Sequence, residues 1–315
     1  MVGQVPFDTE RESMTVNEHL SHFAGLPVTD FPDEDGRRPR PADVPGPTAW
    51  RVQYDWQTPF PEILHEFLDT VDAARLTHLV TGWDDSCDTI ELLVDAADRL
   101  PALRHLFVGD IAYWESEISW IGRGDITRLV EAFPRLETLE VRGNCDMQGR
   151  PFASEALRRL RLETGGLPGR VVRNLCACDL PNLEHLDLWL GVDDYGGDTT
   201  VADLAPILSG ERFPSLRHLG LEDAPRADEI AAAVADAPIA ARLESLSLAL
   251  GTLTDEGAEA LLSGQPLTRL RRLDLHHHFL SDAMMERVRQ ALPGVEVNLD
   301  EQKELDDCPY VAVSE

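Results

Sequence analysis

A leucine pattern that returns eight times is the feature of this sequence that most constrains its fold. The pattern L-x-x-L-x-[apolar] starts at Leu76, Leu103, Leu136, Leu157, Leu183, Leu216, Leu243 and Leu270. Successive starts differ by 27, 33, 21, 26, 33, 27 and 27 residues. A fixed motif at such intervals indicates one structural unit per repeat, and the variation indicates loops of different length.

Each unit reads as a strand followed by a helix. A period-2 apolar pattern gives way to a helical one, as in Ile126, Leu129 and Val130. A helix N-cap is expected at Asp88, Asp125, Thr200, Thr254 and Ser281. One unit cannot bury its own leucines, but stacked units share a continuous core. The intervals match a long leucine-rich repeat, and they predict an α/β solenoid: a horseshoe with a parallel sheet on its concave face and helices on its convex face.

Two segments carry a resemblance to known families. Residues 243–292, with the motif L-T-D-E-G-A, resemble ribonuclease-inhibitor-like leucine-rich-repeat proteins. The N-terminal segment N-E-H-L-x-x-F-A-G-L-P-V, Asn17 to Val28, resembles an uncharacterised group of bacterial leucine-rich-repeat proteins. Genes of that group tend to lie beside radical-SAM and ATP-grasp enzymes. The resemblance therefore implies an accessory to bacterial biosynthetic or modification enzymes.

Three regions are predicted along the chain. Residues 1–48 read as an N-terminal arm or linker, because prolines and mixed charges gather in its second half. Residues 49–299 form the repeat domain: a degenerate N-terminal cap repeat, eight repeats and a last edge strand. A 27-residue offset places Val52 opposite Leu79 in that cap. Residues 300–315 form an acidic C-terminal tail.

Charge and composition limit the possible partners. The formal net charge is −29, with a pI near 4.6, so the chain lacks the basic surface that contacts nucleic acid or anionic membranes. A protein or peptide with a basic surface is the expected partner. Five irregularly spaced cysteines favour buried free thiols. The N-terminus has no apolar signal segment, which indicates a cytoplasmic location.

Alternation along each strand predicts which side chains stand on the concave face. Positions 4 and 6 of the motif point into the core, so positions 3, 5 and 7 point outward. In the middle repeats these positions form a charged strip, which we expect to contact a partner. Its residues are Glu140, Arg142, Arg159 and Arg161.

Aromatic residues gather in the loops that follow the strands. The first 33-residue interval carries Tyr113, Trp114 and Trp120 after its strand, and the second carries Trp189 and Tyr195. Trp83 lies in an acidic turn after the first repeat's strand. Large aromatics often anchor interfaces, so these residues are candidate partner contacts. In the alternative, Trp114 and Trp120 fold inward and cover the strand ends.

A second candidate site combines histidine and acid. His185 and His218 occupy position 3 of successive repeats, beside Asp187 and Glu222. These side chains could bind zinc or another divalent ion. Apart from this patch, no nucleophile or cofactor-binding motif is present in the sequence, and no cofactor is expected. The leading hypothesis is a non-enzymatic protein or peptide interaction scaffold; the alternative is a metal-dependent enzyme or accessory factor that uses this patch.

Overall fold

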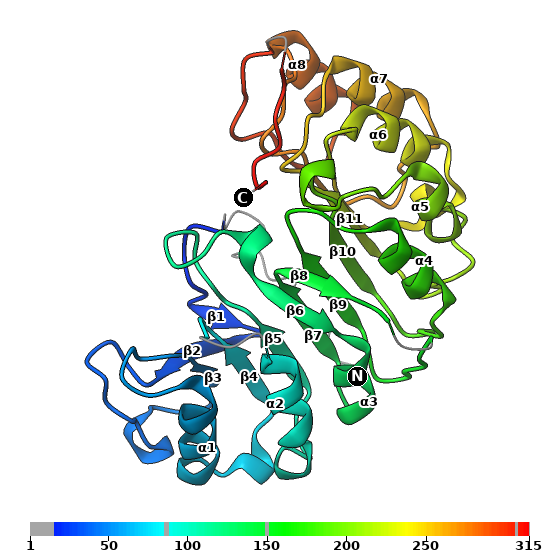
Figure 1. Ribbon diagram of the computed structural model, residues 1–315. Helices are drawn as coiled ribbons and strands as arrows, with labels where there is room; N and C mark the ends of the chain where they lie inside the picture. The colour runs from blue at the N-terminus through cyan, green and yellow to red at the C-terminus, as the bar shows by residue number, and fades with distance from the viewer. Residues whose placement is uncertain (1–15, 85–87, 149–150, 306–307, 315) are drawn as a thin grey trace.

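The computed structural model describes residues 16–84, 88–148, 151–305 and 308–314, and Figure 1 shows a curved sheet with helices along its outer side. The strands are β1 (His22–Phe23), β2 (Leu26–Phe31), β3 (Ala49–Val52), β4 (His78–Thr81), β5 (His105–Val108), β6 (Gly122–Asp125), β7 (Thr138–Arg142), β8 (Asn144–Asp146), β9 (Arg159–Glu163), β10 (His185–Trp189), β11 (His218–Glu222), β12 (Ser245–Ser247), β13 (Arg272–Asp274) and β14 (Glu296–Asn298). The helices are α1 (Phe60–Thr70), α2 (Thr89–Asp95), α3 (Thr127–Ala132), α4 (Gly169–Ala177), α5 (Val201–Leu208), α6 (Ala227–Asp236), α7 (Asp255–Ser263) and α8 (Asp282–Ala291).

The sheet follows the order of the repeats. Within the described ranges, twelve strands lie in the order β1-β2-β3-β4-β5-β7-β9-β10-β11-β12-β13-β14, and β6 pairs with β8 separately. Every pair from β2 to β14 is parallel, and only β1 runs antiparallel to its neighbour. The predicted leucine-rich-repeat solenoid, with its parallel sheet inside and helices outside, is therefore confirmed.

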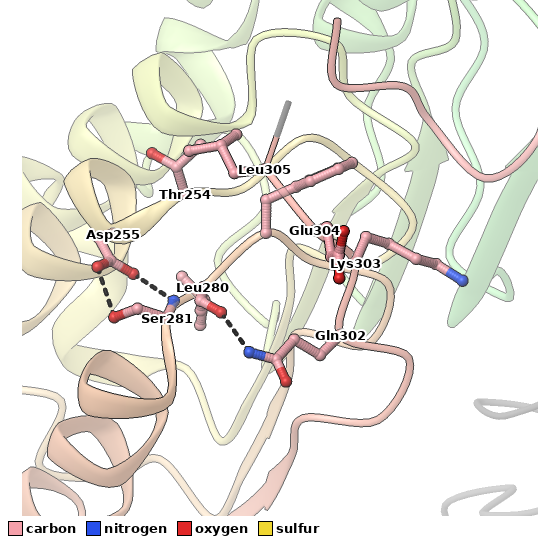
Figure 2. Close-up of a pocket in the computed structure, with 9 residues that line it drawn as sticks. Thr254, Asp255, Leu280, Ser281, Gln302, Lys303, Glu304 and Leu305 are labelled. Carbon is pink, nitrogen blue, oxygen red and sulfur yellow. Dashed lines mark hydrogen bonds between the residues drawn. The ribbon is translucent and has the colours of Figure 1, made fainter. Parts of the chain in front are cut away.

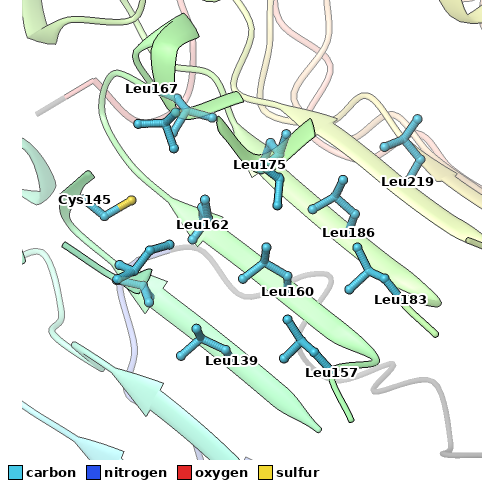
Figure 3. Packing of buried hydrophobic residues seen from close by; sticks show 14 of the residues in the cluster. Leu139, Cys145, Leu157, Leu160, Leu162, Leu167, Leu175, Leu183, Leu186 and Leu219 are labelled. Atoms are coloured by element: carbon cyan, nitrogen blue, oxygen red, sulfur yellow. The ribbon is translucent and has the colours of Figure 1, made fainter. Parts of the chain in front are cut away.

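The leucines of the motif fill the layer between sheet and helices. Leu139, Leu160 and Leu186 are paired across β7, β9 and β10, and all three are at most 1% exposed. Figure 3 shows these side chains in a row across the strands. One apolar cluster continues from Phe31 to Leu299. This single core is what stacked repeats should produce, since each unit buries its leucines only against its neighbours.

Three of the five predicted N-caps are present, whereas Asp88 makes no side-chain cap bond to α2, and Ile126 instead of Asp125 is the N-cap residue of α3. Side chains of Thr200, Thr254 and Ser281 each accept a hydrogen bond from a backbone N–H of the first turn of α5, α7 and α8. Such a bond satisfies a donor that the helix itself leaves unpaired. In the described residues, every helix is too short or too polar to cross a bilayer.

The ends of the chain differ from the sequence prediction. Strand pairing begins at β1 and β2, so the sheet starts before residue 49 and the segment 1–48 is more than a linker. In the cap repeat, Trp50 rather than Val52 lies opposite Leu79. A shift of two residues leaves the same side chains on each face, so the leucine pattern does not distinguish these registers. Residues 1–15 and the tail residues 306–307 and 315 lie outside the described ranges.

Cysteine burial matches the expectation in part. Cys145, Cys176 and Cys178 are buried free thiols, whereas Cys308 is exposed. Burial raises the pKa of Cys145 to about 12, so that thiol stays protonated and unreactive at neutral pH. Cys87 lies outside the described residues.

Candidate functional site

The side-chain rows of the concave face are present, but their middle part is buried. Glu140, Arg142 and Arg161 are only 2%, 4% and 7% exposed. The expectation that this charged strip stands in solvent as a partner contact is therefore wrong for these three residues. Arg159, at the start of β9, is the member that keeps a partly exposed side chain.

Arg161 lies at the centre of an ion-pair network that explains how these charges tolerate burial. Its Nε donates to Glu163 at 2.7 Å, and its two terminal nitrogens reach Asp187 at 3.2 Å and Glu222 at 3.4 Å. Arg142 donates to the other Glu163 oxygen at 2.6 Å. Burial alone would lower the pKa of Arg161, but the three carboxylates raise it. Buried charges are stable only when paired in this way.

The two ends of the chain close over this network. Val313 donates its backbone N–H to Asp223 at 3.0 Å, and Ala312 donates to the carbonyl of Leu250 at 2.8 Å. At the other end, the Leu20 N–H donates to the buried Asp110 carboxylate. Residues from both ends meet in one small apolar cluster. Its members are Val16, Ile118, Trp189, Ala249, Leu250 and Val313.

Trp189 belongs to that cluster, so its predicted role as an accessible contact is wrong. It is 1% exposed, and its indole N–H donates to Glu222 at 2.6 Å. A buried tryptophan needs such an acceptor for its one polar atom. The same Glu222 carboxylate also accepts from Ser247 at 2.5 Å.

Three of the four predicted metal ligands come together around one carboxylate. His185 Nε2 lies 2.5 Å from one oxygen of Asp187, and His218 Nε2 lies 2.6 Å from the other. Their ligand atoms lie within 4.8 Å of one another. Glu222 is outside this group because Arg161, Trp189 and Ser247 hold it. Asp187 already accepts from both imidazoles and from Arg161, so a divalent cation would have to displace three donors.

The aromatic residues of the long loop after β5 are exposed. Trp120 is 76%, Trp114 65% and Tyr113 51% exposed. Ile118 and Ile121 of the same loop are buried instead, so it is these isoleucines, and not the tryptophans, that cover the strand ends. Tyr195, in the other long loop, is half-buried.

One exposed aromatic side chain, Trp56, was not among the residues predicted from the sequence. Trp56, which follows β3, is 80% exposed and stacks on Trp83 with ring centroids 5.2 Å apart. Tyr54 contacts both rings at 5.5 and 4.9 Å. The cap repeat contained the signal: the rule for strand-end loops, applied to it, would have included Tyr54 and Trp56.

We call the aromatic group after β3, β4 and β5 the aromatic rim; it consists of the exposed Trp56, Tyr113, Trp114 and Trp120 and the half-buried Trp83. All five residues follow strands of the N-terminal half of the sheet, so the loops that hold them leave its carboxyl edge. Unlike the charged strip, the aromatic rim can be reached by a partner without any movement of the chain ends.

Of the hollows that the described residues line, two matter for the candidate sites. The larger, about 760 Å³, is a groove between the last repeats and the tail. Figure 2 shows that its polar groups bond to one another: Ser281 donates to Asp255, and Gln302 to the carbonyl of Leu280. The smaller, about 190 Å³, opens at the amino edge of the concave face and includes His185, His218 and Arg159.

Comparison with solved structures agrees with the repeat architecture. A crystal structure of a Bacteroides fragilis protein from a structural genomics consortium is 27% identical, with a TM-score of 0.73, over 82% of this chain and 76% of that one. No protein-family model and no curated protein matches the chain.

Two further solved structures are more weakly similar, with TM-scores below 0.5. One is to the TLR13–ssRNA13 complex, at 16% identity and a TM-score of 0.40, covering 82% of this chain and 37% of that one. The other is to a leucine-rich-repeat protein of Leptospira interrogans, at 16% identity and a TM-score of 0.26, covering 79% and 71%.

Proposed function

We propose that this chain is a non-enzymatic scaffold that binds a protein or peptide partner through the aromatic rim. The observation that supports the proposal is the exposure of large aromatic side chains on loops that follow consecutive strands. Soluble proteins seldom leave tryptophans in water without a use for them, and tryptophan is enriched at the energetic centres of interfaces. A rigid repeat scaffold presents such loops at low entropic cost.

The loop after β5 is held in place by contacts that do not involve its exposed rings. Asn144 donates its side-chain amide to the carbonyl of Ser119 at 2.6 Å, and the N–H of Tyr113 donates to Val16 at 2.8 Å. The buried Ile118 and Ile121 anchor the same segment. A partner would therefore meet preformed contacts rather than a loop that must first become ordered.

A basic partner surface suits this scaffold. The net charge of −29 creates a negative field around the molecule, which attracts basic partners and raises their association rate. We further propose that this chain is a cytoplasmic accessory protein that acts together with bacterial biosynthetic or modification enzymes. The resemblance of Asn17–Val28 to uncharacterised bacterial leucine-rich-repeat proteins is what supports this assignment.

The test is affinity purification from the host of origin with paired variants. Wild-type chain should retain a defined partner, and the double variant Trp56→Ala/Trp120→Ala should lose it. Calorimetry with the purified partner should then give a loss of about 2 kcal/mol or more for a central tryptophan. Leu305→Ala, which removes an exposed apolar side chain (60%) away from the rim, is the matched control.

Thermal unfolding separates an interface role from a packing role. Both tryptophans are exposed, so the double variant should unfold at nearly the wild-type temperature. The proposal fails if the variant retains the partner unchanged. It also fails if partner loss accompanies a fall of several degrees in Tm, which would indicate that the rings support the fold.

A further inference from the structure

Trp56 is held in a backbone conformation that its side chain disfavours. Its φ is +64°, in the left-handed region where a Cβ atom crowds the following carbonyl oxygen and glycine is preferred. Leu250 and His277 share such a φ, but both are buried, so the packing of their side chains offsets the strain. Trp56 is 80% exposed, so the fold gains little from an indole at this position.

Hydrogen bonds to one carboxylate impose this conformation. Oδ1 of Asp55 accepts from the backbone N–H of Gln57 at 3.0 Å and from that of Thr58 at 2.7 Å, which closes a tight turn around Trp56. Oδ2 of Asp55 accepts from the Arg38 guanidinium at 2.7 Å. A residue keeps a strained φ only where its surroundings fix it, and such residues cluster at binding sites. The strain therefore points to a use for the exposed ring outside the fold.

Trp56 belongs to a group of three rings, Tyr54, Trp56 and Trp83, which we call the aromatic triad. The indole of Trp56 lies on that of Trp83, with ring centroids 5.2 Å apart and planes at 20°. Tyr54 contacts the Trp83 ring at 4.9 Å, and its backbone N–H donates to the Trp83 carbonyl at 2.9 Å. Because one face of the Trp56 ring lies on Trp83 and most of the side chain is exposed, its other face is open to solvent. The triad thus presents a flat, preformed aromatic surface.

The charges around the aromatic triad favour a cation. Arg38 binds two carboxylates, Asp55 at 2.7 Å and Glu66 at 3.1 Å, so this ion-pair group keeps a net negative charge. Arg123 is paired with Asp84 at 2.6 Å. The faces of aromatic rings are electron-rich and attract cations. The net charge of −29 adds a long-range attraction for any basic ligand.

An arginine side chain suits this surface better than other ligands. Its guanidinium is planar and weakly hydrated, so it stacks flat on an indole, whereas the ammonium of lysine is compact and strongly hydrated. A neutral side chain would gain nothing from the negative field. Nucleobases also stack on aromatic rings, but the phosphates that accompany them would be repelled by an acidic chain.

We propose that the aromatic triad binds an arginine side chain of the partner, which stacks on the open face of Trp56. This inference rests on the proposed binding function of the aromatic rim and names the chemistry of one of its contacts. The remaining rim residues, on the loop after β5, lie outside the triad. The arginine contact therefore accounts for one part of the rim and leaves the other part to apolar contacts.

The test follows the indole N–H signals by NMR of the full chain labelled with ¹⁵N-tryptophan at low salt. The probes are a blocked glycine–arginine–glycine tripeptide and the same peptide with citrulline or lysine in place of arginine. Citrulline has the shape of arginine without its charge, and lysine has the charge without the planar shape. The signals of Trp56 and Trp83 should shift with the arginine peptide, while those of the buried Trp50 and Trp189 stay in place.

Variants at Trp56 separate binding from folding. The citrulline peptide should bind the wild-type chain about threefold or more weakly than the arginine peptide, as expected for an exposed cation–π contact. Trp56→Gly removes the ring and relieves the strained φ, so it should abolish the shift at Trp83 and unfold at the wild-type temperature or above. Trp56→Ala keeps the strain and should unfold below Trp56→Gly. Tyr310→Ala removes an exposed ring outside the rim and should leave peptide binding unchanged.

Three outcomes would overturn the arginine contact. The first is a citrulline or lysine peptide that binds as tightly as the arginine peptide, and the second is no shift of the Trp56 and Trp83 signals with any peptide. The third is a fall of several degrees in the Tm of Trp56→Gly, which would make the ring part of the fold. If the peptides fail while Trp56→Ala/Trp120→Ala still loses the partner at an unchanged Tm, the rim binds that partner by other chemistry and only the arginine contact is withdrawn.

Discussion

Gly220 shows how one absent side chain shapes the concave face. A Cβ atom at Gly220 would lie 2.0 Å from Oδ1 of Asp187, closer than any real contact. The other repeats place a side chain at this motif position. Without one at Gly220, Asp187 leans across β11 and reaches His218 as well as His185. The shared carboxylate, and with it the orientation of both rings, depends on this glycine.

At the residue scale, His105 should titrate far below an ordinary histidine. Burial and the His78 ring, stacked at 4.3 Å, lower the pKa of His105 to about 4. Between about pH 6.5 and pH 4 the unfolded chain then binds the proton that the folded chain does not. Stability from this group is complete above that window and falls as the pH falls through it.

Histidine NMR and urea unfolding check this prediction together. The signal that disappears in His105→Gln should titrate near pH 4 in the folded chain and near 6.5 in urea. Between pH 7 and pH 5 the variant should lose less stability than the wild type. A folded-state pKa near 6.5 for His105 would contradict the prediction.

At the element scale, the C-terminal segment 308–314 acts as a cover for the sheet. Val311 and Val313 are 7% and 5% exposed, and Tyr310 contacts the rings of His277 and Phe279. Burial raises the pKa of Asp223 well above its ordinary value, and the hydrogen bond from the Val313 N–H offsets part of that rise. The tail thus keeps Trp189 and Leu250 out of water, and it turns an open sheet into a closed surface.

Removal of residues 308–315 should uncover that part of the sheet. Loss of two buried valines, each contributing about 1.5–3 kcal/mol, should lower Tm by several degrees. Hydrogen exchange should accelerate at residues 222–225 and 248–252, where the tail docks, with far-UV circular dichroism unchanged. Ser314→Ala is the control. Unchanged exchange in the truncated chain would mean that the tail is not a cover.

At the scale of the whole molecule, a net charge of −29 opposes compaction. Like charges repel across the surface, and salt screens that repulsion over a Debye length of about 8 Å at 0.15 M. The buried Arg161 network is screened much less. Sodium chloride should therefore raise Tm, with most of the rise complete by about 0.15 M. A flat or falling Tm over this range, measured by scanning calorimetry, would exclude self-repulsion as a significant term.

The sequence by itself determined the repeat, its strand and helix, and the row that each side chain joins. The repeat, its secondary structure and its rows depend only on residue spacing within one unit and on contacts between neighbouring units. The leucines at positions 4 and 6 of the motif show both the spacing and the contacts. It also identified four of the five aromatic rim residues: a change of interval reveals the long loop that carries Tyr113, Trp114 and Trp120, and the acidic turn after the first repeat's strand singles out Trp83. Trp56 was missed because the cap repeat lacks the full motif.

Only the tertiary structure decided which of these side chains stay accessible. The cover over the concave face comes from non-repeating segments at both chain ends. Val313 contacts Asp223 across 90 residues, and nothing in a periodic pattern predicts such a contact. The orientation of the two imidazoles depends likewise on a carboxylate shared between strands and on the space left by Gly220. The leucine period reflects packing between neighbouring repeats, whereas the cover over the charged strip comes from contacts with segments that do not repeat.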